Sequence, residues 1–404
     1  MPRAGIIAEY NPLHRGHSFL MGEARRILGA ETAVVCVMSG NFVQRGDFAV
    51  VDKRRRAAAA VASGADLVLE LPLPWAVSSA EDFAKGAVES LAAAGVIDYL
   101  VFGSECGDAG ALMRAASALE SEAFSQRLRR ELSSGTGISF PAARQRALAA
   151  AASPEEAALL GEPNNILGVE YCKQLLRLGS SIQPLAVLRR GAPHGGEGPG
   201  DAPYSASAIR ALLRRGEIEA ALAGMAPAMA EAFQEAQTAG EAPVFYENCE
   251  RAVLARLRSM SRDEFAALDM GREGLSNRLW RASREACSVA QVLEGAKTKR
   301  YPLARLRRMV LWAWLGLRPA LVPEHVPYLR PLAANAVGRA LLAEMRTRAA
   351  LPVLMKPGAV RRMPETARGV FELEARGTDL YALGFPRLEA ARGGAEWRSG
   401  MVVL

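Results

Sequence analysis

The amino-acid sequence lacks the marks of small secreted proteins, of zinc proteins and of membrane proteins. Its 404 residues include five cysteines, an odd number, widely scattered and without a Cys-x-x-Cys pair, which argues against a disulfide framework and a zinc site. No apolar run is long enough to cross a bilayer, and residues 1–3 lead directly into an apolar segment instead of a signal peptide. We therefore expect a cytoplasmic protein that makes no membrane contact and builds no metal site from its own side chains.

Histidine is also scarce, and two of the four histidines stand together. His14 and His17 form an HxGH motif directly after the apolar run 4–8. A strand that breaks at Asn11-Pro12 and then re-enters a helix would place both imidazoles beside the exposed N–H groups of the helix start, where a polyphosphate is held. The motif therefore predicts a nucleotide site.

The chemistry of nucleotidyl transfer accounts for these residue types. An oxyanion attacks the α-phosphorus of a nucleoside triphosphate, and hydrogen-bond donors fixed in advance stabilise the negative charge that builds on the phosphate oxygens. Gly16 lacks a Cβ and so allows the backbone to approach phosphate closely. Because a motif this short also occurs in ordinary turns, its context in the chain decides between the two interpretations.

Strand and helix patterns alternate through the first half of the chain. Short segments rich in Val, Ile and Leu predict strands at 4–9, 32–38, 66–71, 99–102 and 182–188. Helical patterns lie between them at 16–28, 52–62, 80–94, 109–152 (a pair of helices) and 165–178. This order predicts an α/β fold with a Rossmann-like parallel sheet, in which ligands bind beyond the carboxyl ends of the strands.

The second half has a different composition, which predicts two domains. Strand signals nearly vanish after residue 216, where Ala, Leu, Arg and Glu dominate. We expect residues 1–215 to form a nucleotide-binding catalytic domain and residues 216–404 a mainly α-helical, basic domain. Residues 251–308 carry 14 Lys/Arg against 6 Asp/Glu, an excess that suits the phosphates of a nucleic acid but also occurs on solvated helix faces.

A Gly- and Pro-rich loop at 191–203 leads to a second motif. The loop is long enough to cover a substrate or to be a tolerated surface insertion, and its His194 could contact phosphate or stay on the surface. It is followed by SASAIR, in which Ser205 is placed to cap a helix and Arg210 lies one turn inside it. Hydroxyls and N–H groups at a helix start bind phosphate and Arg adds a forked donor, whereas the alternative is a capped helix with a surface Arg.

Further sequence blocks extend the pattern over nearly the whole chain. The opening GIIAEYNPLHRGH is followed by VFGSE at 101–105, PNNILG at 163–168, SASAIR at 205–210, REGLSNRL at 272–279, TKRYPLARLRRM at 298–309 and TDLYALG at 378–384. With these blocks in this order, the chain closely resembles the bacterial tRNA(Met) cytidine acetate ligase family, a branch of the HxGH nucleotidyltransferases. The resemblance implies an ATP-dependent, AMP-forming ligase that acts on tRNA.

The resemblance also assigns roles to residues. It implies catalytic roles for His14, His17 and Arg210, with Mg²⁺ bridging the phosphates of ATP. The sequence does not decide between the neighbours in PNN or between the two arginines after the fifth strand, although Asn165 and Arg190 are our first choices. With both members of each pair and the serines of SASAIR included, the expected ATP-binding residues are Ile7, Ala8, Glu9, Tyr10, Asn11, Pro12, Leu13, His14, Arg15, Gly16, His17, Ser18, Phe19, Leu20, Gly103, Asn164, Asn165, Arg189, Arg190, Ser205 and Ser207.

A basic strip in the helical half is the candidate tRNA surface. Basic side chains with Tyr301 among them suit RNA phosphates and an unstacked base. By resemblance, this half presents elongator tRNA(Met) to the catalytic domain. The residues of the basic strip are Lys297, Lys299, Arg300, Arg305, Arg307 and Arg308.

The implied reaction has two steps that share one phosphate site. Acetate attacks the α-phosphorus of ATP to give acetyladenylate and pyrophosphate, and the exocyclic amine of the wobble cytidine then takes the acetyl group, forming N4-acetylcytidine and AMP. The chain departs from the family pattern at Leu13, where Phe is usual, at Arg15, where Asn is common, and in SASAIR, where SATSIR is more common. None of these changes removes an imidazole of the HxGH motif.

Two other functions were weighed against this one. An adenylyltransferase acting on a phosphorylated small molecule would leave the basic helical half without a role. A noncatalytic tRNA-binding protein is the other alternative, and the intact histidines argue against it. The sequence leaves the oligomeric state open.

Overall fold

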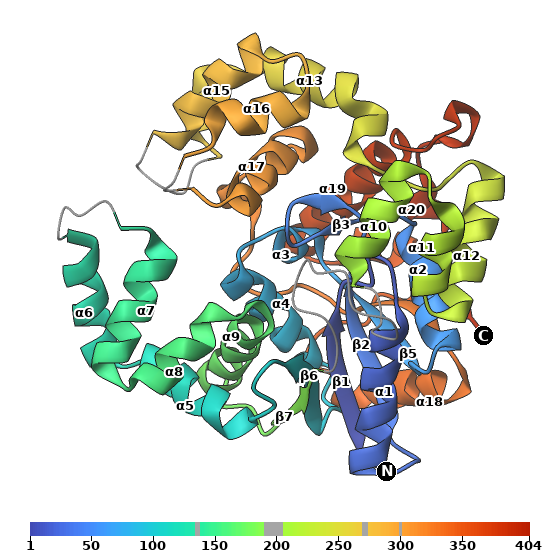
Figure 1. The fold of residues 1–404 in the computed structure, drawn as a ribbon. Coiled ribbons are helices and arrows are strands. Elements are labelled where there is room, and N and C mark those ends of the chain that lie inside the picture. The colour runs from blue at the N-terminus through green and yellow to red at the C-terminus, as the bar shows by residue number, and fades with distance from the viewer. Residues whose placement is uncertain (134–137, 190–204, 269–273, 299–300) are drawn as a thin grey trace.

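The computed structural model describes residues 1–133, 138–189, 205–268, 274–298 and 301–404, and a seven-stranded sheet lies at the centre of this described part (Figure 1). The strand order is β7-β6-β1-β2-β5-β8-β9. Neighbouring strands are parallel throughout except that β8 runs antiparallel to β5. The strands are β1 (Arg3–Ala8), β2 (Ala33–Ser39), β5 (Leu67–Leu71), β6 (Tyr99–Ser104), β7 (Gln183–Leu188), β8 (Arg330–Ala334) and β9 (Val402–Val403).

The α/β fold with a parallel sheet is confirmed, and each of the five strands expected in the first half is present. A small separate hairpin of β3 (Phe42–Val43) and β4 (Asp47–Phe48), which the sequence pattern did not predict, follows β2. The segment 109–152 contains three helices instead of the expected pair. These are α5 (Ala109–Leu119), α6 (Glu122–Ser133) and α7 (Phe140–Ala151).

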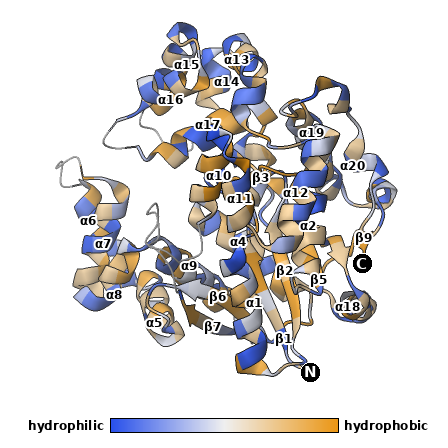
Figure 2. Cartoon of the chain, turned by 45° about the vertical axis from the view of Figure 1, so that its right-hand side comes forward, coloured by the Kyte–Doolittle hydropathy of each residue, from blue (hydrophilic) through white to orange (hydrophobic). Residues whose placement is uncertain are grey.

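Helices cover both faces of the sheet because its central strands are apolar on both sides. In β2, Val35 and Val37 join one core cluster while Val34 and Cys36 join the other, since successive side chains of a strand point to opposite faces. Figure 2 shows these central strands as strongly hydrophobic beneath mixed helices. One cluster packs against α4 (Ala80–Ala93), α5, α9 (Pro163–Arg177) and α18 (Ala336–Arg348), and the other against α1 (Arg15–Leu28), α2 (Lys53–Ala62), α10 (Ala206–Arg215), α11 (Ile218–Gly224) and α12 (Pro227–Ala239).

A group of helices in the second half packs around a core cluster that also takes in Phe42 and Phe48 of the β3–β4 hairpin, and the group lies above the sheet in Figure 1. This helical group contacts the first half of the chain at the β3–β4 hairpin, where the ring of Phe48 stacks on Trp314 at a centroid distance of 5.3 Å. The group consists of α13 (Glu250–Ser259), α14 (Arg262–Ala266), α15 (Leu275–Glu285), α16 (Val289–Ala296) and α17 (Leu303–Leu315). The remaining helices are α3 (Leu73–Ala76), α8 (Pro154–Ala158), α19 (Glu365–Ala382) and α20 (Ala395–Arg398).

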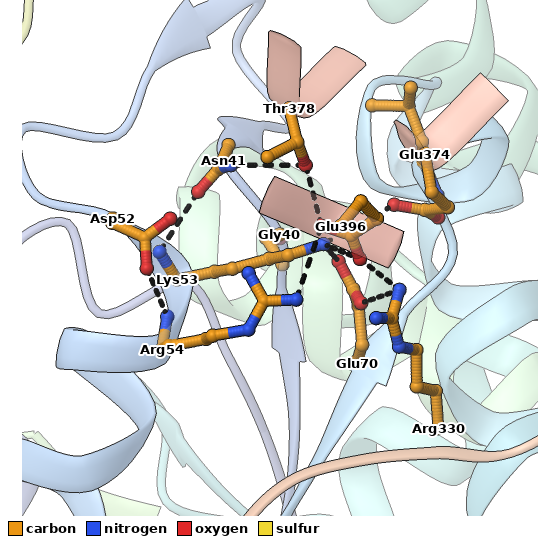
Figure 3. Close-up of polar contacts among 12 residues, drawn as sticks. Gly40, Asn41, Asp52, Lys53, Arg54, Glu70, Arg330, Glu374, Thr378 and Glu396 are labelled. Carbon is orange, nitrogen blue, oxygen red and sulfur yellow. Dashed lines mark hydrogen bonds and ion pairs between the residues drawn. The ribbon is translucent and has the colours of Figure 1, made fainter. Parts of the chain in front are cut away.

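A buried charge cluster ties the end of the chain back to the sheet (Figure 3). Lys53 of α2 donates to Glu396 of α20 at 2.8 Å and to Glu70 of β5, and Arg330 of β8 pairs with the same Glu396. All four side chains are at most 5% exposed, so each buried charge is compensated by an oppositely charged neighbour. Burial alone would raise the pKa of Glu396, but Lys53 and Arg330 outweigh burial and hold that pKa well below its usual range.

Two findings bear on the expected organisation. Residues 216–404 are not all apart from the first half, because β8 and β9 extend its sheet and the buried charge cluster joins α20 to α2. The division at residue 216 stays a prediction. Within the described residues, no helix combines the length and apolarity needed to span a bilayer.

Candidate active site

A cleft of about 360 Å³ opens at the carboxyl ends of β1 and β6. This is the edge at which a parallel α/β sheet binds its ligands. The cleft brings together most of the expected site residues from segments far apart in the chain. Those that line it are Ile7, Ala8, Glu9, Tyr10, Asn11, His14, His17, Leu20, Gly103, Asn164, Arg189, Ser205, Ser207 and Arg210.

The two histidines of the HxGH motif are locked by the start of α1. His14 is the N-cap of this helix, and its Nδ1 accepts a hydrogen bond from the backbone N–H of Gly16 at 3.1 Å. The Nδ1 of His17 accepts from the backbone N–H of His14, also at 3.1 Å. Because Nδ1 is the acceptor in both rings, the proton of each neutral imidazole resides on Nε2. Each ring therefore offers one N–H donor on its Nε2 side.

Both imidazoles are neutral at physiological pH. Burial, followed by the positive charges of Arg189 and Arg210, lowers the pKa of His14 to about 4. Burial, His14 and Arg189 lower the pKa of His17 well below its ordinary value. The two rings stack at a centroid distance of 3.8 Å, an arrangement that two charged imidazoles would disfavour.

The loop that carries the histidines is fixed from three sides. Asn11 donates to the carbonyl of Phe48 and accepts from the N–H of Val50, which joins the loop to the segment after the β3–β4 hairpin. Arg210 donates to the carbonyl of Asn11 at 2.7 Å, so the SASAIR helix holds the HxGH loop directly. The N–H of Ala226 donates to the carbonyl of the fully buried Leu13 at 3.2 Å. The side chains of the motif are thus preorganised.

Gly16 has a structural role beside the one expected. A Cβ at this position would lie 2.9 Å from Cε1 of His14 and 3.0 Å from its Nδ1. Glycine is therefore needed so that the His14 ring can fold over the helix start and accept the N–H of Gly16. Gly16 does not line the cleft itself, and the close approach of its backbone to phosphate stays a prediction.

The SASAIR helix behaves as expected. Ser205 caps α10 by accepting from the N–H of Ala208 at 3.2 Å. Arg210 also donates to the hydroxyl of Ser207 at 3.3 Å, which directs the guanidinium along the cleft wall. Burial lowers the pKa of Arg210, although Asp47 and Glu9 act in the opposite direction.

The PNN segment separates its two asparagines. The carboxylate of Glu105 accepts the backbone N–H groups of both Asn164 and Asn165 at the start of α9. Asn165 is buried and accepts from the N–H of Cys106, whereas Asn164 lines the cleft with its Oδ1 3.5 Å from Nη1 of Arg189. The geometry therefore favours Asn164 over our first choice, Asn165. Arg190, the other first choice, lies outside the described residues, as does His194.

Not all of the expected nucleotide segment faces the cleft. Its turn and the outer side of the first helix supply residues that do not line it, namely Pro12, Leu13, Arg15, Gly16, Ser18 and Phe19. Leu13, which stands where the family usually has Phe, is a core residue and not a direct ligand contact. These six residues belong to the HxGH loop and its helix, and their contact with ATP stays a prediction.

Sequence reasoning missed several lining residues. Gln44 and Arg45 line the cleft from the tip of the β3–β4 hairpin. Each strand of this hairpin has only two residues, which is too short for an alternating pattern to predict it. The apolar wall of the cleft comes from helices and strands that the sequence predicts from their apolar pattern, a pattern that does not show which residues face a ligand. These additional lining residues are Ile6, Ala80, Phe83, Phe102, Pro163, Ile166, Leu167, Tyr171 and Ala206.

Only part of the basic strip is exposed, and several of its residues pack against other parts of the protein. Lys297 is exposed, and Arg305 lies over the ring of Tyr301 at 5.4 Å. Tyr301 itself is buried in the helical core, so the expectation that its ring is available to stack on a base is wrong. Arg308 donates to the carbonyl of Gln44 at 3.2 Å, and Arg307 packs beside Gly46 of the same hairpin. Lys299 and Arg300 lie outside the described residues.

The parallel sheet with two fixed imidazoles and two arginines at its carboxyl edge defines a nucleotidyltransferase. Residues 1–395 match the family model described as HIGH Nucleotidyl Transferase. The chain is 34% identical over 414 residues to the tRNA(Met) cytidine acetate ligase of Acetivibrio thermocellus, covering 99% of both chains. It belongs to the tRNA(Met) cytidine acetate ligase family, which confirms the resemblance seen in its sequence blocks.

Other relatives and solved structures agree over the same extent. The tRNA(Met) cytidine acetate ligase of Syntrophomonas wolfei is 35% identical over 415 residues, covering 98% of both chains. The crystal structure of Thermotoga maritima TmcAL bound with alpha-thio ATP superposes with a TM-score of 0.93 at 33% identity, covering 100% of both chains. The apo form of the same protein has a TM-score of 0.95 at 33% identity and the same coverage.

Proposed function

We propose that this protein is an ATP-dependent tRNA(Met) cytidine acetate ligase. It activates acetate as acetyladenylate and transfers the acetyl group to the exocyclic amine of the wobble cytidine of elongator tRNA(Met), forming N4-acetylcytidine. The observation that carries the proposal is the pair of neutral imidazoles fixed at the cleft edge in a chain related end to end to such ligases. We further propose that the reaction takes place in the cytoplasm.

The first step needs stabilisation of charge on the α-phosphate. His14 and His17 line the cleft, and their Nε2–H groups donate to the phosphate oxygens as the carboxylate oxygen of acetate attacks and pyrophosphate leaves. A neutral imidazole donates without giving up its proton, which suits charge stabilisation. Arg189 and Arg210 add positive charge beside the histidines. Their charges, together with burial, lower the pKa of His14.

ATP is held by the cleft as a whole. Gly103 is the next-to-last residue of β6 and lines the cleft, and a Cβ there would lie 3.2 Å from Cγ of Arg189, so the missing side chain leaves room between the strand and this arginine. Asn164 stands beside Arg189 and can hydrogen-bond the nucleotide, while Ser205 and Ser207 stand at the start of α10 near the phosphates. Apart from the acidic Glu9, the expected ATP-binding residues that line the cleft are retained as contacts in this proposal.

Mg²⁺ fits this site as a metal that arrives with the nucleotide. Within the described residues, no group of three or more His, Cys, Asp or Glu side chains is placed to hold a metal ion. Magnesium commonly keeps several waters and binds substrate phosphates instead of an all-protein cage. When bound with ATP, Mg²⁺ would be held chiefly by the triphosphate and water, and it would supply positive charge to the pyrophosphate that leaves.

The tRNA reaches the cleft from the side of the helical group. Lys297 and Arg305 at the start of this surface supply positive charge for the backbone phosphates, and Lys299, Arg300, Arg307 and Arg308 complete the proposed strip. The strip adjoins the active site, because Arg308 contacts the β3–β4 hairpin whose tip lines the cleft. Binding at the strip should weaken steeply with salt.

Incubation with radiolabelled acetate, ATP and total tRNA tests the proposal. We expect label in tRNA and, after digestion to nucleosides, in N4-acetylcytidine. Pyrophosphate release that requires a phosphorylated metabolite in place of acetate would identify an adenylyltransferase of the simpler kind. ATP binding without any turnover would leave a noncatalytic tRNA-binding protein.

A further inference from the structure

The second half-reaction needs a proton acceptor that the first does not. The exocyclic amine of cytidine attacks the acetyl carbon, an N–C bond forms, and the C–O bond to phosphate breaks with its electron pair going to AMP. The nitrogen must lose one proton as the amide forms. AMP is a good leaving group and needs no proton from the enzyme, so a base beside the amine is the missing part.

The histidines do not provide this base. The Nδ1 lone pair of each ring is occupied by a backbone N–H, and Nε2 carries the proton. Arg45, Arg189 and Arg210, which also line the cleft, stay protonated at any ordinary pH and have no acceptor atom. The residues that fit the first step are thus donors throughout.

Glu9 is the one acidic side chain among the described residues that line the cleft. It stands directly after β1, five residues before the first histidine of the HxGH loop. The negative charge of a carboxylate in this cleft repels the negatively charged triphosphate of ATP. The presence of Glu9 at this position therefore calls for a chemical role.

The carboxylate is oriented and only half used. Its Oε1 accepts the backbone N–H of Gln44 at 2.7 Å, which fixes the group against the tip of the β3–β4 hairpin. For the other oxygen, Oε2, no donor occurs in the part of the chain that the structure describes. The backbone carbonyl of Glu9 accepts from Arg56, and Tyr10 follows with a φ of 47°, so the chain turns sharply after it. One oxygen is anchored and the other is left for a ligand.

The charges around Glu9 set its basicity. Burial raises the pKa of Glu9, while the hydrogen bond from Gln44 and the charges of Arg210, Arg45 and Arg56 lower it, and burial prevails. Tyr171 lines the same cleft, and burial followed by the charge of Glu9 raises the pKa of its phenol. A carboxylate with a raised pKa is a better proton acceptor at neutral pH than an exposed one.

We propose that Glu9 is the general base of acetyl transfer and that its free carboxylate oxygen accepts the proton that the cytidine amine loses. This rests on the proposed function and deepens it, because it assigns the second half-reaction to a residue distinct from those that serve the first. Glu9 has no part in the attack of acetate, since acetate is already an anion.

The test separates the two half-reactions in the Glu9→Gln variant. Gln keeps an oxygen that can accept the N–H of Gln44, so the hairpin contact survives while the basic group is lost. Hydroxylamine is an uncharged, strong nucleophile at neutral pH and traps acetyladenylate as acetohydroxamate without help from a base. We expect hydroxamate formation from acetate and ATP to change by less than about tenfold, while acetylation of tRNA falls by about 10²–10⁴-fold.

Two further variants serve as controls. Glu9→Asp keeps a carboxylate and should recover part of the transfer rate. Glu105→Gln alters a carboxylate that caps α9 beside Asn164, and it should weaken both half-reactions to the same degree through ATP binding. The pH profile of transfer in the native enzyme should rise through the pKa of Glu9, and this limb should vanish in Glu9→Gln.

Several results would overturn the assignment. An equal loss of hydroxamate formation and tRNA acetylation in Glu9→Gln would show that Glu9 binds ATP or Mg²⁺ instead. Undiminished tRNA acetylation would show that no base at this position is needed. If the native enzyme forms neither product, the proposed function itself is overturned. This result differs from failure of the Glu9 assignment, which appears only in the Glu9→Gln variant.

Discussion

Gly16→Ala tests whether the His14 ring is held where the mechanism needs it. In the native chain the ring folds over the helix start and its Nδ1 accepts the N–H of Gly16 at 3.1 Å. An added Cβ would lie 2.9 Å from Cε1 and 3.0 Å from Nδ1 of His14, whereas carbon atoms in contact prefer about 3.5–4.0 Å. The ring must therefore swing away, and its hydrogen bond to the backbone is lost.

The magnitude follows from what the swing removes. One fixed donor to the α-phosphate is displaced, and loss of one such donor costs about 10²–10³ in rate, or about 2.7–4 kcal/mol of transition-state stabilisation. Ala is favoured over Gly in a helix by up to about 1 kcal/mol, and this gain offsets the loss of the His14 cap, which costs about 1 kcal/mol. Activity should fall while the free energy of unfolding changes little.

Acetate-dependent exchange of pyrophosphate into ATP measures the first step, and thermal unfolding measures stability. Gly22→Ala is the matched control, because Gly22 lies in the same helix, α1, and a Cβ there would meet nothing within 4 Å. It should gain stability and keep the exchange rate of the native enzyme. If Gly16→Ala exchanges pyrophosphate as fast as the control, His14 is not the donor that we infer.

Three other predictions concern the same site and the buried charge cluster. His17→Ala should lower adenylate formation by about 10²–10⁴-fold with the circular dichroism spectrum unchanged, and an unaltered rate would refute its role. The NMR titration of His14 should have its midpoint at about 4, so its contribution to the free energy of unfolding is present above pH 6.5 and declines as pH falls toward 4, where only the unfolded imidazole binds the proton; an ordinary midpoint would contradict its burial. Glu396→Gln leaves Lys53 and Arg330 with less compensation and should lower the free energy of unfolding by about 3–5 kcal/mol in urea, whereas the exposed Glu389→Gln should have no effect.

Local patterns predicted most of the catalytic half. The strands from β1 to β7 that build the parallel part of the sheet are short, apolar and separated by helical periodicity, and all of that information lies within a few neighbouring residues. By contrast, β8 carries Arg330 and Pro331, so it does not read as a strand. It forms because β5 offers an edge to pair with and because Glu70 and Glu396 neutralise the buried guanidinium.

The same contrast holds at the site. The HxGH and SASAIR motifs pointed to the nucleotide because their residue types and order are properties of the chain. The choice between Asn164 and Asn165 was beyond sequence reasoning, since it depends on how Glu105 caps α9 and which side chain then turns inward. Tyr301 was wrongly expected on the surface for the same reason, because the core that covers it comes from distant helices.

From the order of its residues alone, this chain shows an α/β nucleotidyltransferase fold and the identity of its two imidazoles, because periodicity and short motifs are local. Only the tertiary structure decided which ring nitrogen of each imidazole carries the proton. It also decided that one carboxylate lies among the hydrogen-bond donors that line the described part of the cleft, and that α20 completes the buried charge cluster with Lys53 and Arg330. Each of these depends on contacts between segments distant in the chain, and such contacts leave no periodic trace in the sequence.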